Sequence, residues 1–115
     1  KMNLVNMAKS AKSLGSTPIL MASSPAFASN EEGYYFHMWD VCMAVKMAAD
    51  ELKIPFIDNY HAFFDYMKRE NVTLPDLVNT LHPTDLGYKV MFDNVMRNLY
   101  LSEIPSDYDT VTYKQ

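Results

Sequence analysis

The residues whose side chains could do chemistry stand closest together in residues 78–88, which read VNTLHPTDLGY. Pro83 restricts its own φ and keeps His82 out of the helical region, so the imidazole is presented from extended backbone. Thr84 and Asp85 can accept hydrogen bonds from the free amides of a helix that follows. We interpret the segment as a catalytic loop at the start of an amphipathic helix.

The same segment resembles the last signature block of the SGNH/GDSL hydrolases, a family of esterases and lipases. That block usually contains an acid, two residues, His-Pro, a few residues, and then Gly followed by an aromatic residue or His. His82, Pro83, Gly87 and Tyr88 match it. The resemblance implies that His82 is the general base. The position of the acid carries Asn79, which has no negative charge to stabilise an imidazolium.

Several groups could replace the missing acid. The side-chain oxygen of Asn79 could hold the imidazole, or a backbone carbonyl could do so and leave a Ser-His dyad. One of three aspartates, Asp58, Asp76 or Asp85, could also take the role, and the sequence does not choose among these alternatives. Because an amide in place of the acid can lower a triad's rate by about four orders of magnitude, a weak or inactive site is a further alternative.

Other polar residues carry weaker signals. Ser23 and Ser24 follow a predicted strand but lack the Gly-flanked turn of a nucleophile, and Cys42 is expected to be a buried, inert thiol. His37 falls inside a predicted helix and His61 at the start of another, and both are expected to be structural. The histidines share no short ligand spacing, so no metal and no cofactor are predicted.

Composition excludes some classes of protein. At 115 residues the chain is about one small domain, and 49% hydrophobic with 21% charged residues is ordinary for a globular protein. A net charge of −4 argues against a nucleic-acid partner, which would need a basic surface. No apolar run approaches the roughly 18 residues of a membrane span, and no signal peptide is visible.

The chain alternates helical and strand-like patterns. Helices are predicted where apolar residues recur at helical spacing, and strands where short apolar runs lie between turn residues. The expected order is helix 2–14 ended by Gly15, strand 17–22, loop 23–33, helix 31–52, strand 54–58, helix 62–69, loop 70–80 with one helical turn after Pro75, helix 84–101, and an extended tail 102–115. Asp58, at the end of a strand, is expected to cap the next helix or to form a turn.

Helical spacing also predicts which faces are apolar. The stripes are Leu4, Met7, Ala8, Ala11 and Leu14 in the first helix, Tyr35, Met38, Trp39, Cys42, Val45, Ala49 and Leu52 in the second, and Tyr88, Met91, Phe92, Val95 and Leu99 in the last. We expect the second stripe to be core.

This order predicts a doubly wound α/β fold with a parallel sheet. Two strands alone would leave bare edges, so further strands are expected from elsewhere. The family resemblance implies that residues 1–101 are the C-terminal half of a flavodoxin-like three-layer α/β/α sandwich, incomplete in this chain. No Gly-Asp-Ser block occurs, and no capping signal precedes the first helix, so the chain looks cut.

Two hypotheses about function follow. In the first, the chain completes an SGNH-type serine esterase whose nucleophile and oxyanion hole lie in a missing N-terminal half or a companion chain. Its substrate would be a small acyl ester or an acetylated sugar. In the second, the chain is a non-catalytic structural or interaction module that retains the hydrolase scaffold, as the absent nucleophile and Asn79 suggest.

Overall fold

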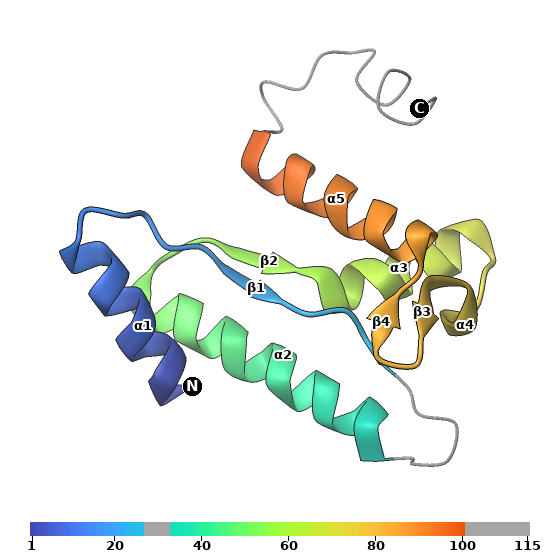
Figure 1. Cartoon of the computed structure of the whole chain (residues 1–115), viewed down its shortest axis with the longest axis horizontal. Helices are drawn as coiled ribbons and strands as arrows, with labels where there is room; N and C mark the ends of the chain where they lie inside the picture. The colour runs from blue at the N-terminus through green and yellow to red at the C-terminus, as the bar shows by residue number, and fades with distance from the viewer. Residues whose placement is uncertain (27–32, 101–115) are drawn as a thin grey trace.

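A computed structural model of the chain describes residues 1–26 and 33–100 (Figure 1). The tail predicted at 102–115 and most of the loop predicted at 23–33 therefore lie outside the described residues. Within them the elements are α1 (Met2–Ser13), β1 (Leu20–Ala22), α2 (Gly33–Leu52), β2 (Phe56–Asp58), α3 (Asn59–Glu70), α4 (Leu74–Leu77), β3 (Val78–Asn79), β4 (His82–Pro83) and α5 (Asp85–Tyr100).

The central sheet of the described part contains two parallel strands, β1 and β2, each three residues long. Met21 pairs with Ile57 in the middle of the register, and α2 connects the strands. The two strands and their parallel arrangement confirm the predicted α/β class. The other edge of β1 has no strand beside it among residues 1–26 and 33–100.

The helices form a layer on each side of the strands. Figure 1 shows α2 on one side and α5 on the other, and α2 packs against both strands while α5 packs against β2 and α3. One buried cluster joins the layers of α2, β1 and α3. The other joins α3, α4, β3 and α5. Their buried members are Ala22, Cys42 and Tyr60 in the first, and Phe63, Leu77, Val78 and Val90 in the second.

Side-chain and backbone signals set the helix ends. Gly15 adopts φ +85° just after α1, as its predicted role as a helix terminator requires. Asp58 caps α3 by accepting a hydrogen bond of 2.8 Å from the backbone N–H of His61, which confirms the predicted cap. Because of this cap, α3 begins at Asn59, three residues before the predicted start.

The predicted apolar stripes are only partly covered. In α2, Cys42, Val45 and Ala49 are buried as predicted, but the prediction that Trp39 belongs to the core is wrong, since 48% of its surface is exposed. Tyr88 and Phe92 of α5 are likewise exposed. The physical reason is that periodicity identifies the apolar face of a helix but not which of its residues become buried, and these side chains stay partly accessible in the described part of the chain.

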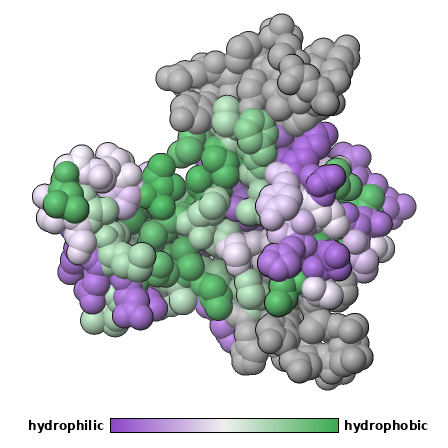
Figure 2. Space-filling view, viewed as in Figure 1, coloured by the Kyte–Doolittle hydropathy of each residue, from purple (hydrophilic) through white to green (hydrophobic). Residues whose placement is uncertain are grey.

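Exposed apolar side chains also border the bare edge of the sheet. Ile19 precedes β1 and is 40% exposed, and Met21 within β1 is 49% exposed. Figure 2 shows apolar side chains gathered over the strands, between α1 and α2 on one side and α5 on the other. The incompletely covered surface of this fold is therefore its sheet and the helix faces beside it.

Candidate functional site

The predicted catalytic residues lie on a small antiparallel hairpin. In the pairing of β3 with β4, Asn79 stands directly opposite His82. Thr80 turns the chain between them with φ +55°, a left-handed conformation uncommon outside glycine. Both Asn79 and His82 are exposed. The hairpin thus brings the two residues of the signature block together at the surface, where the sequence had predicted only a loop.

Hydrogen bonds of the Thr84 backbone and hydroxyl tie this hairpin to the helices on either side. The backbone N–H of Thr84 donates to the carbonyl of Leu77 at 2.9 Å, and its hydroxyl donates to the carbonyl of Asp76 at 2.8 Å. The N–H of Gly87 in turn donates to the Thr84 hydroxyl oxygen at 3.2 Å, so Thr84 caps α5 as predicted. His82 is therefore presented from a braced segment.

Gly87 shows why this segment needs a residue without a side chain. A Cβ atom built at Gly87 would overlap the carbonyl oxygen of Leu77 and would lie 3.1 Å from Cβ of Pro83. The first turn of α5 thus passes directly over the end of α4 and the His-Pro dipeptide. The glycine of the signature block is explained by this close approach.

Two of the aspartates considered as the missing acid have other partners. Asp76 accepts hydrogen bonds from the backbone N–H (2.8 Å) and the hydroxyl (3.0 Å) of Thr73, and these bonds lower the pKa of Asp76 below its usual value. Asp58 binds His61. Asp85 lies in the first turn of α5. Among the described residues, no carboxylate is hydrogen-bonded to His82.

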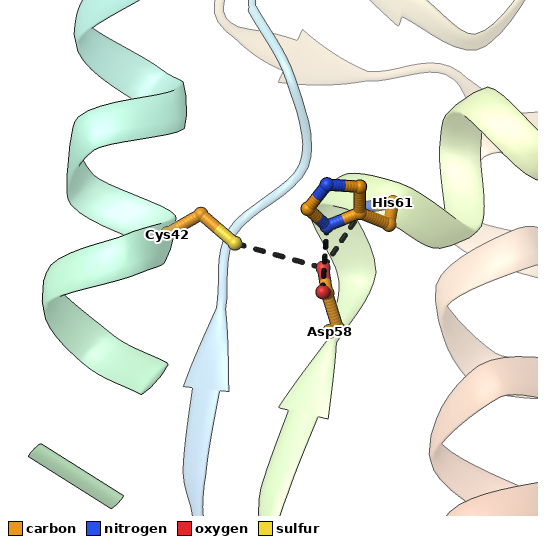
Figure 3. A group of neighbouring side chains, drawn as sticks. All are labelled: Cys42, Asp58 and His61. Atoms are coloured by element: carbon orange, nitrogen blue, oxygen red, sulfur yellow. Dashed lines mark hydrogen bonds and ion pairs between the residues drawn. The ribbon is translucent and has the colours of Figure 1, made fainter. Parts of the chain in front are cut away.

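A second constellation joins three elements that lie apart in the sequence. Cys42 comes from α2, Asp58 from the carboxyl end of β2 and His61 from the first turn of α3 (Figure 3). Nδ1 of His61 lies 2.6 Å from Oδ2 of Asp58, and the Cys42 thiol donates to Oδ1 of Asp58 at 3.6 Å. Cys42 is 2% exposed, as predicted, while half of the His61 side chain is exposed.

Burial, followed by the charge and the hydrogen bond of Asp58, raises the pKa of the Cys42 thiol to about 11. Near neutral pH this thiol is protonated, which agrees with the predicted inert cysteine. The Asp58–His61 pair was not predicted as a unit. Its sequence signal was the spacing of three residues across a strand-to-helix junction, which places a capping carboxylate beside the third residue of the helix.

A polar cavity of about 380 Å³ opens beside this constellation, between α3 and α5. Asp58 and His61 form part of its wall, and Arg69 and Arg97 face it from the two helices. The cavity lies on the side of β2, whereas the exposed apolar surface borders β1.

The remaining candidates are placed as follows. Ser23 is exposed and Ser24 is buried, both directly after β1, and neither is hydrogen-bonded to His82 in the described part of the chain. His37 lies in α2, but its side chain is outside the described residues. None of the helices in the described part is sufficiently long and apolar to cross a membrane.

Comparison with known proteins gives structural matches only. No protein-family model and no curated protein sequence matches this chain. A variant of Axe2, an acetyl-xylooligosaccharide esterase from Geobacillus stearothermophilus, matches with a TM-score of 0.74 and 21% identity over 90% of this chain and 47% of its own. The esterase domain of the ORF1 protein from the zebrafish ZfL2-1 retrotransposon matches with a TM-score of 0.64 and 20% identity, over 87% of this chain and 55% of its own.

A candidate acylhydrolase from Bacteroides fragilis matches with a TM-score of 0.65 and 25% identity, over 87% of this chain and 50% of its own. The chain therefore spans about half the length of the structures it matches. These likenesses confirm the predicted resemblance at the level of the fold: the chain has part of the SGNH-hydrolase α/β fold, with the hydrolase-like scaffold that esterases and acylhydrolases share.

Proposed function

We propose that this chain is the C-terminal half of an SGNH-type serine esterase domain and that His82 is its general base. The observation that carries the proposal is the hairpin that holds His82, because its His-Pro, Thr84 cap and Gly87 contact form one braced unit at the surface. Such bracing suits a base that must stay within hydrogen-bond reach of a nucleophile.

The proposed partner is the other half of the domain, in a further part of the protein or in a companion chain. We expect this other half to bind at the exposed apolar surface beside β1. Ile19 and Met21 are exposed there in the described part of the chain. A third parallel strand at the bare edge of β1 would pair with its free backbone groups, and elements of the same half packed on the face of the sheet would bury these side chains. The exposed stripe of α5, with Tyr88 and Phe92, would be covered by the same half.

The proposed reaction is hydrolysis of a small acyl or acetyl ester, including one carried on a carbohydrate. A serine of the other half would attack the acyl carbonyl while His82 takes its proton, and His82 would return that proton to the leaving alcohol. Water, deprotonated by His82, would then release the acid and restore the serine. Donors of the other half would stabilise the oxyanion.

Asn79 stands where the family carries the acid, directly across the hairpin from His82. An amide can orient a neutral imidazole but adds no charge to stabilise the imidazolium. With Asn79 at this position, we expect ester hydrolysis to be slow. The same residue equally motivates the second candidate function, a non-catalytic module that keeps the hydrolase scaffold.

A fluorophosphonate probe, which reacts with activated serines, separates the two functions. We expect the purified protein to be labelled at one serine outside residues 1–115, and labelling to be lost when His82 is replaced by Ala. Intact mass would show whether the labelled serine is in the same polypeptide or in a companion chain. Absence of labelling in folded protein that contains both halves would contradict the esterase and favour the non-catalytic module.

A further inference from the structure

We propose that Cys42, Asp58 and His61 form a binding site for a divalent transition-metal ion of the zinc class. One sulfur, one oxygen and one nitrogen ligand atom of these residues all lie within 4.8 Å of one another. Figure 3 shows the three side chains converging on one point from α2, β2 and α3. The site is separate from the His82 hairpin and does not depend on the proposed esterase function.

The spacing of the sulfur and one carboxylate oxygen matches that of a tetrahedral zinc site. Metal–sulfur and metal–oxygen bonds of about 2.3 Å and 2.0 Å at tetrahedral angles place the two ligand atoms about 3.5 Å apart. The Cys42 sulfur and Oδ1 of Asp58 are separated by 3.6 Å. Nδ1 of His61 stands 2.6 Å from the second oxygen, Oδ2, so an ion bound through Oδ1 requires the ring to move away from Oδ2 and toward the ion. The half-exposed His61 ring has room for this movement.

The donor set determines which metals fit. A thiolate and an imidazole favour zinc or a similar transition metal, whereas calcium and magnesium prefer sites made of oxygen atoms alone. Both a carboxylate and a thiolate carry negative charge when they bind metal. The ion would thus take the place of the thiol proton that now lies between Cys42 and Asp58.

The three ligands leave room for a fourth. Asp58 and His61 also line the polar cavity between α3 and α5, so water from that cavity can complete the coordination. The backbone N–H of His61 donates to Oδ1 of Asp58, the same oxygen that lies 3.6 Å from the Cys42 sulfur. A carboxylate oxygen has two lone pairs, so Oδ1 can keep this hydrogen bond while it binds the ion. Metal binding is therefore compatible with the cap of α3.

The simpler interpretation is a hydrogen-bonded helix cap with a buried thiol and no metal. Cobalt(II) distinguishes the two, because a cobalt–thiolate bond gives an intense near-ultraviolet charge-transfer absorption. We expect the purified protein, freed of metal and titrated with cobalt(II) under reducing conditions, to develop this absorption at one equivalent. Zinc added afterwards should abolish it.

Two variants and one control complete the experiment. Cys42→Ser should lose the absorption, and His61→Gln should lower cobalt affinity at least tenfold. His82→Gln, which alters an exposed histidine of the hairpin, should bind cobalt as the wild type does. Circular dichroism checks the fold, and if Cys42→Ser does not fold, the exposed His61→Gln variant decides. Absence of the absorption in the wild type, or unchanged affinity in folded His61→Gln, would overturn the metal site.

Discussion

Replacement of Gly87 by Ala tests whether the close approach of α5 to α4 braces the hairpin. In an unhindered helix, Ala instead of Gly would stabilise the protein by about 1 kcal/mol. Here the new Cβ would overlap the carbonyl oxygen of Leu77 and crowd Pro83. Overpacking of this kind typically costs about 1–3 kcal/mol, and moving α5 away would also weaken the hydrogen bond from Thr84 to Leu77, worth about 1 kcal/mol.

The two unfavourable effects outweigh the gain in helix propensity, so Gly87→Ala should lower the free energy of unfolding by about 2 kcal/mol. Urea denaturation followed by far-ultraviolet circular dichroism measures this change. Gly15→Ala is the control for a glycine with open space: it meets no atom within 4 Å, and its φ of +85° should cost only about 1–2 kcal/mol of backbone strain. A Gly87→Ala protein as stable as the wild type, or more stable, would refute the close contact.

Three further predictions concern single side chains. Asn79→Asp should leave ester hydrolysis unchanged or raise it, because a carboxylate stabilises the imidazolium of His82; a large loss in the kcat/KM of the variant would contradict the proposed role. The folded-state pKa of Asp76 is depressed, so its contribution to stability is present above its unfolded pKa of about 3.9 and is lost as pH falls through the lower folded value. Urea midpoints of wild type and Asp76→Asn should therefore converge on acidification from pH 5 to pH 3, and a gap that widens would disprove this sign. Met21→Asp should weaken association with the other half of the domain while the chain stays folded, and unchanged co-purification would argue against the apolar surface as the contact.

The predictions from the sequence are right where a single local signal determines the structure. Gly15 ends the first helix because only a left-handed residue fits there, and the Asp58 cap and the burial of Cys42 follow from residue type and spacing. The His82 hairpin was missed. Its strands have two residues each, and its turn uses Thr80 in a left-handed conformation, which gives none of the usual Gly or Asn turn signals.

The remaining differences come from long-range packing. Periodicity identifies an apolar face but does not say which element covers it, so Trp39 and Phe92 were placed on apolar stripes although both are exposed. The contact of Cys42 with Asp58 spans sixteen residues and exists only because α2 folds back onto the parallel strands. Periodicity within one element does not predict such a contact.

The kcat/KM of the purified protein for a small acyl ester, compared between wild type and His82→Ala, tests the central claim most directly. The measurement requires protein that contains both halves of the domain, and circular dichroism must show that the variant is folded. Loss of the general base should lower kcat/KM by at least about three orders of magnitude. A folded His82→Ala protein with wild-type turnover would contradict the assignment of His82 as the catalytic base.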